Sequence, residues 1–127
     1  MARETDDFSE TLVIYYSVED QRWIAHGLHT DQIGDGDSVI AAIEHALRGI
    51  NAVQTIAHDD PSVEFWREAP PDIQAMAHAA QSLPREIYEI AHRRAHGRWP
   101  NDVPVDVKPD TGVSFKTEIR ERQEVCC

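Results

Sequence analysis

The chain has 127 residues, 41% hydrophobic and 28% charged, which is typical of a globular protein that buries a core without disulfide or metal staples. Its 23 acidic and 12 basic residues give a net charge of −11, which repels phosphate backbones and argues against nucleic acid as a ligand. No apolar stretch suits a signal peptide or a membrane span, and the two cysteines are adjacent, so we expect a cytoplasmic protein.

The first part of the chain predicts two antiparallel strands. Residues 1–10 are polar, and we expect a flexible amino terminus there. β-Branched and aromatic residues fill 11–18 and return in 22–28, and both compositions favour strands. A short polar turn separates the two segments, so a hairpin is expected. Within it, alternation sends Tyr15 and Tyr16 to opposite faces of the sheet.

A third extended segment and a long helix follow the hairpin. Residues 29–33 are expected to be extended, and Gly34 and Gly36 then permit a turn with positive φ. Ser38 is a favourable N-cap for a helix over 39–57. The apolar residues of this helix recur at steps of three and four, so they line one face that should cover the sheet. They are Ile40, Ile43, Leu47, Ile50 and Val53.

The second half of the chain predicts helices followed by a loop and a strand. Asp60 and Pro61 favour the start of a new element, with aspartate as its cap and proline at the first helical position. Two helical patterns occupy 71–81 and 84–96, where prolines and a glycine mark the boundaries. Alternation of apolar and polar residues over 112–120 favours a half-buried strand at an edge of the sheet.

Three short motifs resemble the HicB antitoxin family. They are the strand residues Trp23–Leu28, the turn Gly34–Ser38 and the helical pair Ala42-Ile43. The resemblance implies an α+β fold in which a three- to four-stranded antiparallel sheet packs on one long helix, followed by a helical C-terminal extension. It also implies a partial RNase H-like or double-stranded-RNA-binding-like sheet, no enzymatic activity, and association with a small HicA-like toxin.

The resemblance divides the chain into a module and an extension. No helix-turn-helix or ribbon-helix-helix pattern is evident after the module, which argues against binding to operator DNA. The expected parts are a flexible amino terminus at 1–10, a HicB-like β-β-β-α module at 11–58, a helical extension at 59–97, and a loop, an expected edge strand and a tail at 98–127.

An acidic protein that covers a basic toxin would do so with exposed aromatic side chains and carboxylates. The aromatic rings would supply apolar anchors, and the carboxylates would supply complementary charge. For the aromatic residues and the histidine of the second strand, packing in the core is the alternative. The predicted partner-binding residues are Tyr15, Tyr16, Trp23, His26, Asp35 and Asp37.

Two groups of side chains have the chemistry of metal ligands. Asp31, Asp35 and Asp37 offer oxygen atoms, but the terminal glutamate of a calcium loop is absent, and a solvated turn is the simpler interpretation. His92 and His96 are four residues apart on a predicted helix, a spacing that suits zinc. We predict no metal or cofactor and leave this pair open. The other candidate zinc ligands are Cys126 and Cys127.

The sequence therefore predicts a binding module without catalytic activity. An RNase H-type nuclease needs a carboxylate in its first strand to hold Mg²⁺, and residues 11–18 contain none. We expect a HicB-like antitoxin, or a module derived from one, that forms homo-oligomers and binds a HicA-like toxin protein. An orphan structural or regulatory domain without a toxin partner is the first alternative, and a metal-dependent enzyme that uses His92 and His96 is the second. A neighbouring gene for a small basic protein would favour the first interpretation.

Overall fold

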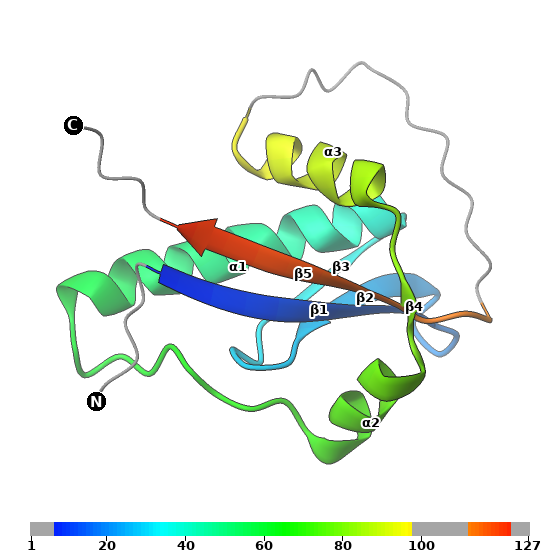
Figure 1. Ribbon diagram of the computed structural model, residues 1–127, viewed down its shortest axis with the longest axis horizontal. Helices are drawn as coiled ribbons and strands as arrows, with labels where there is room; N and C mark the ends of the chain where they lie inside the picture. The colour runs from blue at the N-terminus through cyan, green and yellow to red at the C-terminus, as the bar shows by residue number, and fades with distance from the viewer. Residues whose placement is uncertain (1–6, 98–111, 123–127) are drawn as a thin grey trace.

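A five-stranded mixed sheet forms the centre of the molecule in the computed structural model (Figure 1). The structure describes residues 7–97 and 112–122. The strand order is β3-β2-β1-β5-β4, in which β4 runs parallel to β5 and the other neighbours are antiparallel. The strands are β1 (Asp7–Ser17), β2 (Arg22–Gly27), β3 (Ile33–Gly36), β4 (Gln81–Ser82) and β5 (Phe115–Arg122).

Three helices cover the sheet from both sides. The long helix α1 and the shorter α3 lie on one face, and α2 lies on the opposite face (Figure 1). This arrangement confirms the predicted α+β class with a sheet packed on one long helix, although the sheet has more strands than expected. The helices are α1 (Val39–Asp59), α2 (Pro71–Ala79) and α3 (Arg85–Ala95).

The start and the buried face of α1 agree with the sequence pattern. The Ser38 hydroxyl accepts a hydrogen bond from the Ala41 amide at 3.1 Å, which satisfies a free donor at the helix start. The predicted stripe is buried from Ile40 to Ile50, and Val53 packs against its margin. Apolar side chains of β1 and β2 meet this stripe, so the main core lies between α1 and the sheet.

Gly34 and Gly36 do not form the predicted turn. Both lie in β3, and neither has a positive φ. A Cβ atom at Gly34 would lie 2.2 Å from the Ala46 backbone nitrogen and 2.6 Å from the Ala42 carbonyl oxygen. At Gly36 it would lie 2.6 Å from the Ala41 Cβ. The glycines are therefore needed because α1 packs directly on the backbone of β3.

The amino-terminal strand begins earlier than predicted. β1 starts at Asp7, so the flexible terminus expected at 1–10 is wrong for its last four residues. Glu10 is only 1% exposed. Its carboxylate oxygens accept the His29 amide at 2.9 and 3.0 Å, and one of them also accepts the Thr11 amide at 2.8 Å. Such charge-assisted bonds offset the cost of burying the carboxylate and hold the chain after β2 against β1.

The residues after the module belong to the same core. β5 pairs with β1 along its whole length and contributes the fully buried Ile119. It was expected at an edge, but the short strand β4 lies outside it. In α3, the buried Tyr88 and Ala91 join the core beneath α1. Residues from the expected extension and edge strand thus complete the sheet and cover the main core.

Asp60 ends one helix and does not begin another. Its amide donates to the Ile56 carbonyl at 2.9 Å, which closes the last turn of α1. Its carboxylate accepts from the Ser62 amide at 3.0 Å, so the local bonds form a turn. The next helix starts only at Pro71. A helix end explains the Asp60-Pro61 pattern equally well, because proline cannot continue the preceding helix.

Candidate functional site

The predicted aromatic residues are distributed over both faces of the sheet. Tyr15 and Tyr16 point to opposite faces, as alternation requires, and both are half-buried. Trp23 is only 5% exposed and packs with its ring at 5.4 Å from that of Tyr16, in an edge-to-face arrangement within the main core. Trp23 therefore offers almost no accessible surface to a partner, and its predicted role as a partner contact is replaced by core packing.

His26 is also a packing residue. It is 4% exposed, and its Nε2 atom lies 2.6 Å from a carboxylate oxygen of Asp31. Asp31 has a φ of 55°, in the left-handed region, and Arg67 lies 3.9 Å from its second oxygen. The buried histidine thus holds the connection between β2 and β3 in place through its contact with Asp31. It does not reach the surface, where a partner would contact it.

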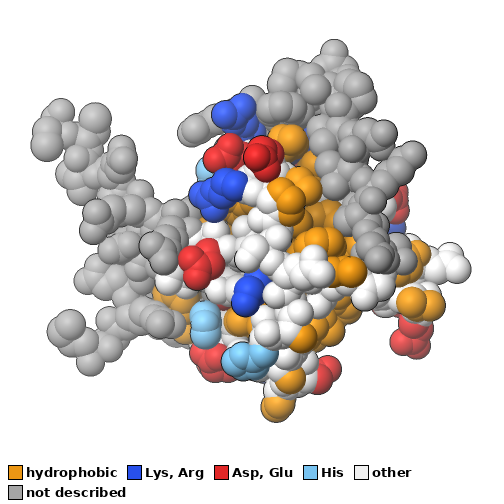
Figure 2. All heavy atoms as spheres, turned by 45° about the vertical axis from the view of Figure 1, so that its right-hand side comes forward, with side chains coloured by type: hydrophobic (Ala, Val, Ile, Leu, Met, Phe, Trp, Pro, Cys, Tyr) orange, Lys and Arg blue, Asp and Glu red, His pale blue; other side chains and the backbone are white. Residues whose placement is uncertain are grey.

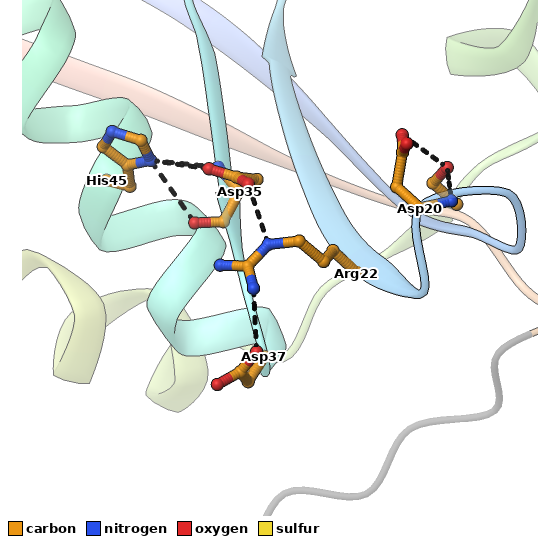
Figure 3. Close-up of polar contacts among 6 residues, drawn as sticks. Asp20, Arg22, Asp35, Asp37 and His45 are labelled. Carbon is orange, nitrogen blue, oxygen red and sulfur yellow. Dashed lines mark hydrogen bonds and ion pairs between the residues drawn. The ribbon is translucent and has the colours of Figure 1, made fainter.

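The two predicted aspartates lie at the outer edge of the sheet, in a cluster with Arg22 and His45 (Figure 3). The Arg22 side chain donates to Asp35 at 2.8 Å and to Asp37 at 3.0 Å. His45, from α1, approaches Asp35 on the other side: the Asp35 amide donates to its Nδ1 atom at 3.1 Å. One outward amide of β3 is therefore already bonded, which discourages another strand from pairing there.

The contacts of this edge cluster shift the pKa of Asp35. The hydrogen bond from Arg22 lowers the pKa of Asp35 below its ordinary value, with smaller contributions from the Arg22 charge and from His45. A carboxyl group with a lowered folded pKa stabilises the fold above its unfolded pKa of about 3.9. That contribution is lost as the pH falls through the lower folded value.

Replacing Arg22 with methionine should raise the pKa of Asp35, because the donated bond and the positive charge are both removed. The carboxyl carbon of Asp35, followed by NMR through an acid titration, gives this pKa directly. Arg67→Met is the matched control, since Arg67 lies near Asp31 and should leave the Asp35 titration unchanged. An identical Asp35 curve in the wild type and in Arg22→Met would contradict the assignment.

An apolar surface lies beside this cluster, and two of its three residues, Ile24 and Ile33, were not predicted from the sequence. Ile24 is opposite Tyr15 in the β1–β2 register, and Ile33 follows in β3 on the same face of the sheet. Ile33 is 56% exposed, whereas Ile24 and Tyr15 are half-buried. We call Tyr15, Ile24 and Ile33 the open sheet face. Alternation along β2 and β3 was the available signal, but it could not tell which face was covered.

Carboxylates from several elements lie beside the open sheet face. Burial raises the pKa of Tyr15, and the nearby charges of Asp72 and Asp20 raise it further. Asp72 comes from α2 and Asp20 from the β1–β2 turn, so separate elements contribute acidic groups around this ring. We call Asp20, Asp35, Asp37 and Asp72 the acidic rim.

The described residues contain no group of three potential metal ligands. Asp35 and Asp37 are separated by the Arg22 guanidinium, which takes the place that a cation would need. The His92 ring, on α3, and the His96 ring, on the residue that caps the end of α3, do lie close together, with centroids 4.4 Å apart. The cysteines considered as further ligands lie outside the described residues.

None of the helices within 7–97 and 112–122 combines the length and the apolar composition of a membrane span. Comparisons of the chain with protein-family models, with curated proteins and with solved structures found no match. The candidate site therefore depends on the geometry described above, and its function is argued from the chemistry of the open sheet face and the acidic rim.

Proposed function

We propose that this protein is a non-catalytic binding module of the HicB-like antitoxin type, which associates in the cytoplasm with a small basic protein. The observation that carries the proposal is an apolar surface with carboxylates beside it. Ile33 is 56% exposed and stands next to Ile24 and Tyr15 on the open sheet face. Exposed apolar surface with a charged border is typical of a protein-binding site.

The open sheet face and the acidic rim would contribute to binding in different ways. Apolar side chains in the centre of an interface supply most of its affinity, and full burial of an isoleucine side chain contributes roughly 1.5–3 kcal/mol. Complementary charge mainly raises the rate of association and excludes partners of the wrong sign. A net charge of −11 and the acidic rim together favour a partner rich in lysine and arginine.

The order of elements is consistent with this proposal. β1, β2 and β3 are followed directly by α1, which is the order implied by the resemblance to HicB antitoxins. The Gly34–Ser38 motif of that resemblance has a physical reason here, because its glycines seat α1 on β3 and its serine caps α1. With one face of β2 and β3 covered by α1, the opposite face remains for a partner.

Replacing Ile33 with aspartate should weaken binding to the proposed small basic partner protein by about tenfold or more, because an apolar contact is lost and a charge is buried in its place. The matched control is Ile56→Asp. Ile56 is exposed to nearly the same extent, 53%, but lies near the end of α1. Titration calorimetry with both purified proteins gives the two affinities.

The same complex should form more slowly as the ionic strength rises, because salt screens the acidic rim.

Equal loss of affinity in Ile33→Asp and Ile56→Asp would show that the interface does not lie on the open sheet face. If no complex forms with a basic protein, or if the open sheet face is buried in a homodimer in solution, the antitoxin function fails. The chain would then be an orphan structural or regulatory domain.

A further inference from the structure

A cleft of about 470 Å³ lies between α2, β4 and the adjoining parts of β1 and β5. Its volume falls within the roughly 300–1,000 Å³ that is usual for small-molecule sites. Figure 2 is turned toward the side on which β4 and α2 lie, and it shows Lys, Arg and His side chains among hydrophobic and acidic ones. The cleft is toward the β4 end of the sheet, whereas the open sheet face is toward β3.

The apolar part of the lining comes from three separate segments. Leu28 follows β2, Ala77 belongs to the last turn of α2, and Leu83 follows β4, and all three are buried. The Leu83 amide donates to the Lys116 carbonyl at 2.9 Å, which holds this wall against β5. Such a lining suits a hydrocarbon group and supplies no hydrogen bonds to it.

The polar part of the lining contains the cations Lys116 and Arg85, the anion Glu118, and histidine, serine and threonine side chains. Lys116 lies on β5 beside Ser82 of β4, and His78 and Arg85 stand at the ends of the neighbouring helices. Arg85 is already engaged: it donates to the Glu118 carbonyl at 3.5 Å, lies 4.7 Å from the centre of the Tyr88 ring, and has its Nε atom 3.8 Å from Glu89. Within the part of the chain that the structure describes, the Lys116 ammonium and the His78 ring have no hydrogen-bond or ion-pair partner.

We propose that this cleft binds a small organic monoanion, a carboxylate that carries an apolar chain or ring. Anions are repelled by a chain of net charge −11, so a cationic group left without a partner in a concave site points to an anionic ligand there. The Lys116 ammonium would hold the carboxylate, and the Thr11 and Ser82 hydroxyls are the neutral donors in the same lining. Glu118 also lines the cleft, and its charge disfavours a multiply charged head group.

Octanoate is a suitable probe, with octanol and octylamine as its neutral and cationic counterparts. In a titration followed by amide NMR shifts, octanoate should perturb Thr11, Lys116 and Thr117. Octanol should bind about tenfold more weakly, because the charge-assisted bond is absent. Octylamine should bind more weakly still. Each probe is kept below its micelle-forming concentration.

Lys116→Gln should weaken octanoate binding about tenfold and leave octanol binding unchanged, since only the charge at the head group is altered. Arg48→Gln is the matched control, because Arg48 is a cation of α1 that is paired with Glu44 outside the cleft. Ser82→Trp, at an exposed position of β4, should fill the cleft and abolish the binding of both probes. Thermal midpoints show that each variant is folded.

The proposal is overturned if octanol binds as tightly as octanoate, or if Lys116→Gln and Arg48→Gln behave alike. Amide shifts that map to the open sheet face, or no shifts with octanoate at all, would equally overturn it. None of these outcomes affects the proposed protein partner, because the two surfaces share no residue.

Discussion

Replacing Gly34 with alanine should destabilise the protein by roughly 3 kcal/mol or more, which is at the upper end of the cost of overpacking. The new methyl group would lie 2.2 Å from the Ala46 nitrogen and 2.6 Å from the Ala42 oxygen. Both are backbone atoms of α1, so no side-chain rotation relieves the clash, and the helix would have to move away from β3. Urea denaturation measures the change, and the adjacent Ile33 should shift in NMR spectra.

Gly49→Ala is the control, and it should have the opposite sign. A Cβ atom at Gly49 meets only the end of the flexible Gln32 side chain, at 3.3 Å. Because alanine favours a helix over glycine by about 1 kcal/mol, this variant should be slightly more stable than the wild type. Gly34→Ala with wild-type stability would show that α1 does not pack on the backbone of β3.

Leu47→Ala should cost about 2–5 kcal/mol, the range for a large-to-small change in a core. Leu47 is only 5% exposed and belongs to the α1 stripe that meets the sheet and α3. The loss should appear as a lower thermal midpoint and a lower urea midpoint with an unchanged denaturant slope.

Ile56→Ala serves as the matched control for Leu47→Ala. Ile56 is on the same helix but is 53% exposed, so its truncation should change stability by less than about 0.5 kcal/mol. Equal midpoints for the two variants would contradict the placement of α1 on the sheet. A large loss in Leu47→Ala alone would support the division of the sheet into a covered face and the open sheet face.

Local sequence signals were sufficient for the elements that depend on local physics. The Ser38 cap and the stripe from Ile40 to Ile50 predicted the start and the buried face of α1, because capping and helical periodicity act within a few residues. Prolines and alternation likewise indicated α2, α3 and β5 near their observed bounds. The candidate site was predicted only in part: Tyr15 and the two aspartates are accessible, whereas Trp23 and His26 are buried.

The remaining features were decided by segments that are distant in the sequence. Alternation separates Tyr15 from Tyr16 and Ile24 from Trp23, but it does not say which set a helix will cover. Which set is covered depends on the packing of α1, α2 and α3, which come later in the chain. Gly34 and Gly36 suggested a turn because glycine permits many backbone conformations, and only the approach of α1 shows that they are required for packing.

The burial of Glu10 and the exposure of Ile33 could not be predicted from the sequence either. A glutamate in a polar terminus is ordinarily exposed, yet Glu10 is buried because the amide of His29, nineteen residues later, donates hydrogen bonds to its carboxylate. An isoleucine in an extended segment is ordinarily buried, yet Ile33 stays exposed because no described element covers that part of the sheet. Composition and periodicity thus determined the class of fold and most of its elements. Tertiary packing alone decided which side chains remain available for binding, because exposure depends on what lies across the sheet and not on a residue's own neighbours in the chain.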